Sequence, residues 1–499
     1  MTSAVYDRNQ NRNNITLRLV GSIVATGALA FVGILTETMM NVIFPHLMRE
    51  FSIDAATVQW VTTAYLLVVA ATIPLSAFLK RRFTYKAVFS AACVLAIIGS
   101  LLAFWSPSFA VLIVARVVQG VATGTGMPLM FNVILEQSPR TKIGMLMGYG
   151  NLVVALAPAL GPSFGGIVTT FMPWRESFLI IIALLVLIFI LGVVSLRQFV
   201  PTEKTSLNPG HVVLIALGFT GLLYGVEQAG LVVQHVFAGT AVGLTPVIAA
   251  VSLAVGVVCV LTFYWRQCRS ERPLMNLTVL ADPSLRWHLV SLVLLQFVML
   301  GISFTVPNFV QMGLGATSMI AGFVILPGAL LGAFCAPAGG TLLDRKGARL
   351  PVTIGLSFAF LGLLLQGLFA HHLTPLAVAC LHVVYVFGYS FTYSNVFTDG
   401  LKNVAPQLKA DGNAVFNTCQ QFGCALGTAV LATVMSVYQH LGMNAGLSEA
   451  VSTSNGARTG YFVMAAAIAI TALCMARAFG LDALDARGVA SGTPADPRN

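Results

Sequence analysis

The feature that most constrains this chain is a succession of long apolar runs separated by short polar loops. A run of about twenty apolar residues is long enough to cross the ~30 Å of hydrocarbon in a bilayer as an α-helix. Only 9% of the 499 residues are charged, against roughly 25% in an average soluble domain. The sequence therefore predicts an all-α membrane protein with about fourteen transmembrane helices. We expect them near residues 19–45, 58–79, 86–106, 109–135, 143–171, 177–197, 210–233, 240–265, 286–312, 318–343, 350–370, 374–400, 410–438 and 457–479.

The basic residues predict how these helices are oriented in the membrane. With the N-terminus inside, all but four of the 27 basic residues lie in cytoplasmic segments. Arg49, Arg175 and Arg458 fall outside, and Arg116 lies within a helix. This asymmetry is the positive-inside bias of membrane proteins. The formal net charge of +10 thus orients the protein, and we expect both termini to be cytoplasmic and no nucleic acid to be bound.

A sequence repeat predicts two related halves. Residues 74–84 parallel residues 337–347 at a constant offset of 263, and each segment follows the second helix of a six-helix set. Two such halves are typical of alternating-access transporters, whose substrate site lies between the halves near the membrane midplane. We therefore divide the chain into an N-terminal tail, a six-helix bundle, two inserted helices, a second six-helix bundle and a disordered tail. These parts are residues 1–18, 19–200, 201–270, 271–480 and 481–499.

Four short segments carry a resemblance to one family. Residues 112–120 resemble the fourth-helix motif of proton-coupled major facilitator transporters, and residues 157–166 resemble the fifth-helix signature of their antiporters. Residues 343–349 resemble the cytoplasmic loop motif, and residues 37–45 resemble the first-helix motif of fourteen-helix drug:proton antiporters. Within that family the whole chain is most similar to multidrug exporters of the quaternary-ammonium and lincomycin-resistance type. The resemblance implies the major facilitator fold, with two pseudo-symmetric six-helix bundles plus two inserted helices.

The resemblance assigns proton coupling to Glu37 and Arg116. A carboxylate buried in an apolar helix is pushed toward its neutral form, so Glu37 can gain and lose a proton near neutral pH. Counted along their helices at ~1.5 Å per residue, both residues lie ~10–12 Å below the outer surface and can meet. Arg116 either tunes the proton affinity of the carboxylate or clamps backbone carbonyls. Glu37 can alternatively be a helix-end residue in the headgroup region.

The fifth helix combines small residues at four-residue spacing with prolines. Small residues on one face let two helices approach closely, and prolines bend a helix and free backbone carbonyls. The pattern indicates either a sealed interface between the halves, which would block proton leak, or ordinary close packing. The residues of this antiporter motif are Pro158, Gly161, Pro162, Gly165 and Gly166.

The cytoplasmic loop motif differs between the two halves. Arg81 stands in the first half where Asp344 stands in the second, and Thr84 replaces the glycine. A carboxylate here bridges basic residues or meets a helix N-terminus when the cytoplasmic side closes. We expect this lock only in the second half; the alternative is that these are solvated loop charges. The residues of the expected loop gate are Arg82, Asp344, Arg345, Gly347 and Arg349.

Polar and aromatic side chains within the helices are candidates for the lining of a substrate cavity. Such groups face the interior of a helix bundle, because an unsatisfied amide or hydroxyl is costly in hydrocarbon. Many will form hydrogen bonds between helices, and only some are expected to touch substrate. The candidates are Asn41, Tyr65, Gln119, Gln296, Asn308, Gln311, Tyr389, Tyr393, Asn417 and Gln420. Glu227 is either interfacial or a second proton site, and Glu136 and Asp399 are interpreted as helix-boundary residues.

Together, the residues and the resemblance predict a proton-driven antiporter that exports lipophilic, often cationic or neutral, drugs and toxic compounds across the cytoplasmic membrane. The alternative keeps this mechanism and changes the cargo to one endogenous metabolite, siderophore or antibiotic. The cysteines and histidines lack metal-ligand spacing, and no catalytic motif or nucleotide-binding loop occurs. We therefore expect no enzymatic activity, no metal and no cofactor, with the proton gradient as the energy source. The expected partners are small lipophilic substrates, protons and the bilayer; a monomer is expected, and a periplasmic adaptor remains an alternative.

The difference between the two loops yields a first prediction. Asp344→Asn should reduce the efflux of a cationic dye far more than Arg81→Ala, because only the second loop has a carboxylate for the lock. The measurement is dye efflux from cells that contain equal amounts of each variant. Equal losses in the two variants would contradict the inferred asymmetry.

Overall fold

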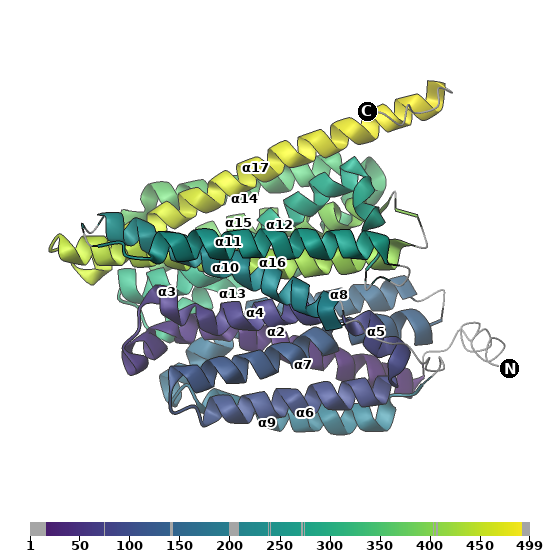
Figure 1. The fold of residues 1–499 in the computed structure, drawn as a ribbon, viewed down its shortest axis with the longest axis horizontal. Helices are drawn as coiled ribbons and strands as arrows, with labels where there is room; N and C mark the ends of the chain where they lie inside the picture. Colours follow the sequence, from purple (N-terminus) through teal and green to yellow (C-terminus); the bar gives the residue numbers. More distant parts are fainter. Residues whose placement is uncertain are drawn as a thin grey trace.

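The computed structural model describes residues 16–491 except for 74, 140–142, 199–208, 238, 240, 271–272, 274, 403 and 406–407. Within this part the chain is helical with short connections, it contains no strand, and most of the long helices run side by side (Figure 1). Threonine side chains cap several helices by accepting a hydrogen bond from a backbone N–H three residues on, as Thr16, Thr84 and Thr317 do.

The helices form a first bundle, an inserted pair and a second bundle. The first bundle consists of α2 (Leu17–Phe51), α3 (Ala55–Val58), α4 (Trp60–Thr72), α5 (Leu75–Arg82), α6 (Tyr85–Phe104), α7 (Phe109–Gln137), α8 (Ile143–Phe171) and α9 (Glu176–Ser195). The inserted pair is α10 (Pro209–Phe237) and α11 (Thr245–Arg269). The second bundle consists of η2 (Leu277–Ala281), α12 (Pro283–Asn308), the π-helical η3 (Phe309–Gly313), α13 (Ser318–Lys346), α14 (Arg349–Phe369), η4 (Ala370–His372), α15 (Pro375–Lys402), α16 (Lys409–Asn444) and α17 (Glu449–Ser491).

The two bundles share one arrangement. The pairs α2–α8, α6–α7 and α6–α9 pack together in the first bundle, and the corresponding pairs α12–α16, α14–α15 and α14–α17 pack together in the second. The offset of 263 relates them: α7 spans 109–137, and adding 263 gives 372–400, close to the bounds of α15 at 375 and 402. The predicted architecture of two pseudo-symmetric bundles with two helices inserted between them is confirmed.

The inserted helices α10 and α11 pack on each other, and α10 contacts α4 of the first bundle and α16 of the second. On the side of α16, the rings of Phe219 and Phe422 lie 4.7 Å apart between centroids. On the side of α4, the indole N–H of Trp60 donates a hydrogen bond to Oε2 of Glu227 at 2.6 Å. The hairpin therefore covers the seam between α4 and α16.

On another seam, α8 of the first bundle packs closely against α13 of the second. Ser163 Oγ donates a hydrogen bond to the carbonyl oxygen of Gly322 at 3.1 Å. A Cβ atom added at Gly166 would lie 2.5 Å from the carbonyl oxygen of Ser318, and one added at Gly322 would overlap the carbonyl oxygen of Pro162. The absence of side chains at the two glycines is therefore what allows the backbones to meet.

The bundles are also tied together at the end where α2 finishes. Asp54, which caps α3, accepts a hydrogen bond from Ser436 Oγ of α16 at 3.2 Å, and the same oxygen lies 3.7 Å from His440 Nε2. Burial tends to raise the pKa of Asp54, but its hydrogen bonds with His440, Thr57 and Ser436 hold that pKa well below its usual range. Asp54 is therefore a charged link between the bundles at neutral pH, and we call this end of the molecule the Asp54 end.

The helices follow the predicted spans with two corrections. The single helix expected over 58–79 is wrong: the chain forms α4, which ends at Thr72, and α5, which begins at Leu75. Disorder expected from residue 481 is wrong as far as Ser491, because α17 continues to that residue through a segment rich in the good helix formers Ala and Leu; residues 492–499 lie outside the described residues. In the described part, eleven helices are long and apolar enough to cross a membrane, and Trp60–Thr72 and Ser318–Gly332 are shorter apolar helices. The expected boundary near residue 200 and the N-terminal residues 1–15 lie outside the described residues.

The close approach of α8 and α13 predicts that a side chain at Gly322 separates the bundles. Gly322→Val should cost about 1–3 kcal/mol of overpacking in this arrangement and should lengthen the distance between spin labels at Phe171 and Leu376, measured by pulsed electron paramagnetic resonance after replacement of the native cysteines. Gly340→Val is the matched control, since a Cβ atom there meets no other atom within 4 Å. An unchanged distance distribution in Gly322→Val would contradict the prediction.

Candidate functional site

A fully buried arginine organises the interior of the first bundle. The guanidinium of Arg116 on α7 is 0% exposed. Its Nε donates a hydrogen bond to the backbone carbonyl of Val61 on α4 at 2.9 Å, and its Nη1 donates to Oε1 of Gln119 at 2.7 Å. The Gln119 amide in turn donates to Ser100 Oγ of α6 at 3.2 Å. Nη2 of Arg116 is buried without a hydrogen-bond partner among the described residues, which leaves one donor unused.

Tyr65 links this arginine to the first helix. The Arg116 guanidinium lies over the Tyr65 ring, 4.1 Å from its centroid, which is a cation–π contact. The Tyr65 hydroxyl donates to the carbonyl oxygen of Gly33 on α2 at 2.9 Å and lies 2.8 Å from Thr123 Oγ1. The arginine network therefore reaches four helices, namely α2, α4, α6 and α7.

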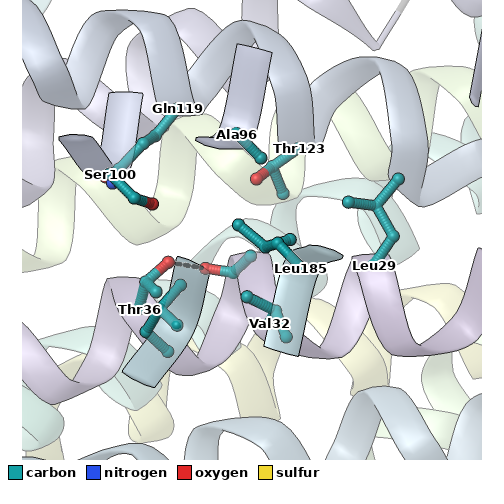
Figure 2. A pocket seen from close by; sticks show the side chains of 10 residues that line it. Leu29, Val32, Thr36, Ala96, Ser100, Gln119, Thr123 and Leu185 are labelled. Carbon is teal, nitrogen blue, oxygen red and sulfur yellow. Dashed lines mark hydrogen bonds between the residues drawn. The ribbon is translucent and has the colours of Figure 1, made fainter. Parts of the chain in front are cut away.

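A small cavity lies beside this network, between α2, α6, α7 and α9 (Figure 2). Its polar lining consists of Thr36, Ser100, Gln119 and Thr123, and leucine, isoleucine and valine side chains complete the wall. Thr36 Oγ1 donates to the Gly33 carbonyl at 2.8 Å, the bond that is dashed in Figure 2. The cavity has space for about one water molecule with several polar partners.

Glu37 lies between the two bundles. Its side chain is 4% exposed, and α2 continues beyond it to Phe51, so Glu37 is not a helix-end residue. Its carboxylate interacts electrostatically with Arg116 and Tyr65 of the first bundle and with Cys424 of α16 in the second. Among the described residues it has no hydrogen-bond or ion-pair partner. The carboxylate is thus free to take up a proton or a cationic group.

A second polar cluster lies across from Glu37 in the second bundle. The rings of Tyr389 and Tyr393 on α15 are stacked at 5.5 Å between centroids. The hydroxyl of Tyr389 donates to Oε1 of Gln296 on α12 at 3.2 Å, and that of Tyr393 donates to Oε1 of Gln420 on α16 at 2.7 Å. The Cys424 thiol lies 3.8 Å from the same Gln296 oxygen. We call this cluster of Tyr389, Tyr393, Gln296 and Gln420 the tyrosine wall; Cys424, which interacts electrostatically with Glu37, lies between it and the first bundle.

Other predicted cavity residues connect the first helices of the two bundles. The Asn41 amide donates to Ser303 Oγ of α12 at 3.1 Å, and the Gln311 amide donates to the Val42 carbonyl at 3.1 Å. Gln311 lies in the π-helical η3, whose wider turn follows Pro307 in the sequence. Asn308 and Asn417 instead donate to backbone carbonyls of their own helices. The residues predicted to line the cavity therefore fall into four groups. Some belong to the arginine network and some to the tyrosine wall, Asn41 and Gln311 link the bundles, and Asn308 and Asn417 bond within their own helices.

The antiporter motif on α8 faces two different helices. Cβ atoms added at Gly161 and Gly165 would meet the backbone of α2 in the same bundle, whereas one added at Gly166 would meet α13 in the other bundle. Pro158 and Pro162 lie within α8. The small-residue face therefore holds α8 against α2, the helix that carries Glu37, and its C-terminal part around Pro162 and Gly166 meets the other bundle.

The expected loop gate lies at the opposite end from Asp54. The side chains of Arg82, Arg345 and Arg349 are exposed, and Gly347 has a φ of +74°, which favours glycine. The side chain of Asp344 lies outside the described residues, so its expected lock stays a prediction.

Several polar contacts have no counterpart in the sequence analysis. Glu227 is buried and accepts a hydrogen bond from Trp60, while its interfacial position stays a prediction. Asp399, interpreted as a boundary residue, is buried beside His288. The sequence could have pointed to Glu227, Asp399 and His288 only through their residue type, since each is an ionisable group within an apolar span.

The chain resembles known transporters in sequence. Residues 7–428 match the family model described as Major Facilitator Superfamily. The chain is 34% identical over 410 residues to the lincomycin resistance protein LmrB of Bacillus subtilis (strain 168), covering 82% of this chain and 84% of that protein. It is 24% identical over 431 residues to the multidrug resistance protein Stp of Mycobacterium tuberculosis (strain ATCC 25618 / H37Rv), covering 86% and 78%.

Solved structures show the same fold. A bacterial homolog of the human lysosomal transporter Spinster, crystallised in an inward-facing and unoccupied conformation, matches with a TM-score of 0.66 at 15% identity, covering 93% of this chain and 98% of that one. A POT family transporter in complex with 5-aminolevulinic acid matches with a TM-score of 0.64 at 15% identity, covering 92% and 96%. With its two pseudo-symmetric bundles and a family match over most of its length, the chain belongs to the major facilitator superfamily of membrane transporters.

Proposed function

We propose that this protein is a proton-driven antiporter that exports lipophilic, often cationic or neutral, compounds by alternating access. The observation that carries the proposal is the buried carboxylate of Glu37, which lies between the bundles beside Arg116 and has no hydrogen-bond partner among the described residues. The names of its relatives, lincomycin resistance protein and multidrug resistance protein, support drugs as the cargo.

The site can bind either a proton or a cationic substrate at the same group. An ionised Glu37 attracts a cation electrostatically, and the stacked rings of Tyr389 and Tyr393 offer a flat aromatic surface nearby. A neutral Glu37 offers no such attraction. The unused Nη2 donor of Arg116 supports the charged state of the carboxylate when no cation is bound. Proton and substrate therefore compete, and the proton gradient supplies the energy without a bound cofactor or metal.

Charge asymmetry supports the cytoplasmic membrane as the location, with both termini inside. In that orientation the Asp54 end faces outward. The contacts of α8 with α13 and of Asp54 with α16 then close the outer side in this conformation. Substrate enters from inside and displaces the proton from Glu37. After the bundles rock to open outward, an external proton neutralises Glu37 and the substrate leaves.

The role of Glu37 predicts that Glu37→Gln abolishes coupling. The amide keeps the shape of the side chain but cannot exchange a proton, so ethidium efflux from cells should fall to less than about a tenth of wild type. The measurement is the initial efflux rate with and without a protonophore. Glu449→Gln, a change at an exposed position at the start of α17, is the matched control and should behave as wild type.

Two outcomes would contradict this proposal in different ways. Normal, protonophore-sensitive efflux by Glu37→Gln would remove Glu37 from the coupling step. Wild-type efflux that is insensitive to a protonophore would remove proton antiport itself. Efflux of one compound only, across a panel of unrelated lipophilic cations and neutral drugs, would replace multidrug export by export of a single metabolite.

The two interpretations of Arg116 predict different results for Arg116→Lys. Lysine keeps the positive charge beside Glu37 but loses the bond from Nε to the Val61 carbonyl and the contact with Tyr65. A buried hydrogen bond from a charged group contributes roughly 1.5–3 kcal/mol, so we expect at least about a tenfold lower transport rate with an unchanged pH dependence. Arg116→Gln should also alter the pH dependence of transport. A wild-type rate in Arg116→Lys would show that the backbone clamp is dispensable.

A further inference from the structure

A buried histidine lies beside a carboxylate in the second bundle, away from Glu37. His288 near the start of α12 is 0% exposed and Asp399 near the end of α15 is 5% exposed. His288 Nε2 lies 3.1 Å from Asp399 Oδ2, and its Nδ1 lies 2.8 Å from the backbone carbonyl oxygen of Ser284. Lys402 Nζ donates to the other carboxylate oxygen at 2.7 Å. The transport cycle proposed above does not use this cluster.

The partners of the imidazole determine how many protons it carries. The carbonyl of Ser284 and the carboxylate of Asp399 are both acceptors, whereas a neutral imidazole has only one N–H donor. A neutral His288 would direct a lone pair at one of these oxygens in a site without solvent, which is costly. Two good hydrogen bonds therefore require an imidazolium. The ammonium group of Lys402 stabilises the ionised carboxylate, so the extra proton belongs to the ring rather than to Asp399.

The surroundings leave Asp399 as the counter-charge of His288. From α16 the nearby side chain is the apolar Phe416, which packs with Gly400 against His288. Asp282, at the start of α12, caps that helix by accepting from the Ser284 N–H, and Asp411 of α16 accepts from the Asn276 N–H.

Three further basic residues of the neighbouring helices are exposed: Arg286 of α12, Lys409 of α16 and Arg477 of α17. In the part of the chain that the structure describes, none of them forms an ion pair with Asp399. The charge on the His288–Asp399 pair is therefore set chiefly by the pair itself and by Lys402.

The same two helices carry the tyrosine wall. Two turns beyond His288, α12 presents Gln296, and this residue accepts the hydrogen bond from Tyr389 of α15. The helices α12 and α15 thus touch at two points. One is the contact of His288 with Asp399, which depends on a proton, and the other is the contact of Gln296 with Tyr389 in the tyrosine wall. Because the helices are rigid, a change in the distance between α12 and α15 at His288 and Asp399 also changes their distance at Gln296 and Tyr389.

We propose that His288 and Asp399 form a second proton-binding site, whose occupancy sets the position of α12 against α15. With the proton bound, imidazolium and carboxylate attract each other and hold the two helices together. When the proton leaves Nε2, its lone pair faces the carboxylate, the attraction is lost and the helices separate at this end. The contact between Gln296 and Tyr389 then changes, so this site couples proton binding to the wall of the cavity.

The first test determines the protonation of the ring and does not depend on transport. Protein labelled with ¹⁵N-histidine in nanodiscs is studied by nuclear magnetic resonance at pH 7, with the His288 signal assigned by its loss in His288→Gln. We expect both ring nitrogens of His288 to be protonated. In Asp399→Asn the ring should become neutral, because an amide N–H can donate to Nε2 in place of the lost carboxylate. A neutral ring in the wild type, or a charged one in Asp399→Asn, would overturn the proposal.

The second test measures the link to the cavity and rests on the proposed function, since it uses binding of tetraphenylphosphonium. In Glu37→Gln the first proton site is absent, so any remaining change in dissociation constant between pH 6 and pH 8.5 reports on a second site. We expect a change of about fivefold, the low end of coupling between two sites in one protein, and its loss in Glu37→Gln/His288→Gln. The control is Glu37→Gln/His372→Gln, since His372 is exposed, and it should keep the change.

The two tests separate the failure of this inference from the failure of the proposed function. A pH dependence that survives His288→Gln would overturn the coupling to the cavity. A protonated His288 in a protein whose efflux is insensitive to protonophores would support the second site and refute the antiport. If His288→Gln elutes as an aggregate in size-exclusion chromatography, Asp399→Asn replaces it in the binding measurement, with the same expected loss.

Discussion

The burial of the Arg116 guanidinium is the constraint on which the first bundle depends. A permanent cation in an apolar helix bundle is stable only if its donors and its charge are compensated inside the protein. Here the compensation comes from three neighbouring helices: a backbone carbonyl of α4, the chain of Gln119 and Ser100 toward α6, and the ring of Tyr65, whose hydroxyl bonds to α2. One charge thereby fixes the positions of four helices. Because Glu37 lies about one turn along α2 from the Tyr65 contact, the same network places the carboxylate beside the arginine.

The contacts within each bundle differ in kind from those between the bundles. Inside, the arginine network and the packing of Gly161 and Gly165 against α2 leave little freedom, so each bundle can move as one body. Between the bundles, the described polar contacts include the hydrogen bonds from Ser163 and Asn41 and the one from Ser436 to Asp54. Water can replace bonds of this kind at small net cost. The structure is thus divided into two stiff parts joined by exchangeable contacts, which is what a rocking motion requires.

The sequence predicted the order of the helices but not their rotation about their own axes. Apolar run length and the offset of 263 were sufficient for two bundles and an inserted pair, and counting residues along helices was sufficient to place Glu37 and Arg116 at one depth. Tyr65 and Gln119 were predicted to line the substrate cavity, and the structure adds that both contact Arg116, because a polar residue in a helix can satisfy a neighbour on any side. The pairing of His288 with Asp399 joins residues 111 positions apart. Such a pairing follows from tertiary packing, for which single-residue patterns carry no signal.

The inserted hairpin has a consequence for how a lipophilic molecule reaches the protein. A compound dissolved in the bilayer approaches from the side, between helices, and not only from the aqueous phase. On one side, α10 lies over α4 and α16, with Trp60 bonded to Glu227 and Phe219 stacked near Phe422. On the opposite seam, formed by α8 and α13, the described residues include no such covering helix. The bilayer therefore meets the two seams differently: the inserted hairpin covers the seam of α4 and α16, whereas the seam of α8 and α13 is closed by the direct contact of those two helices.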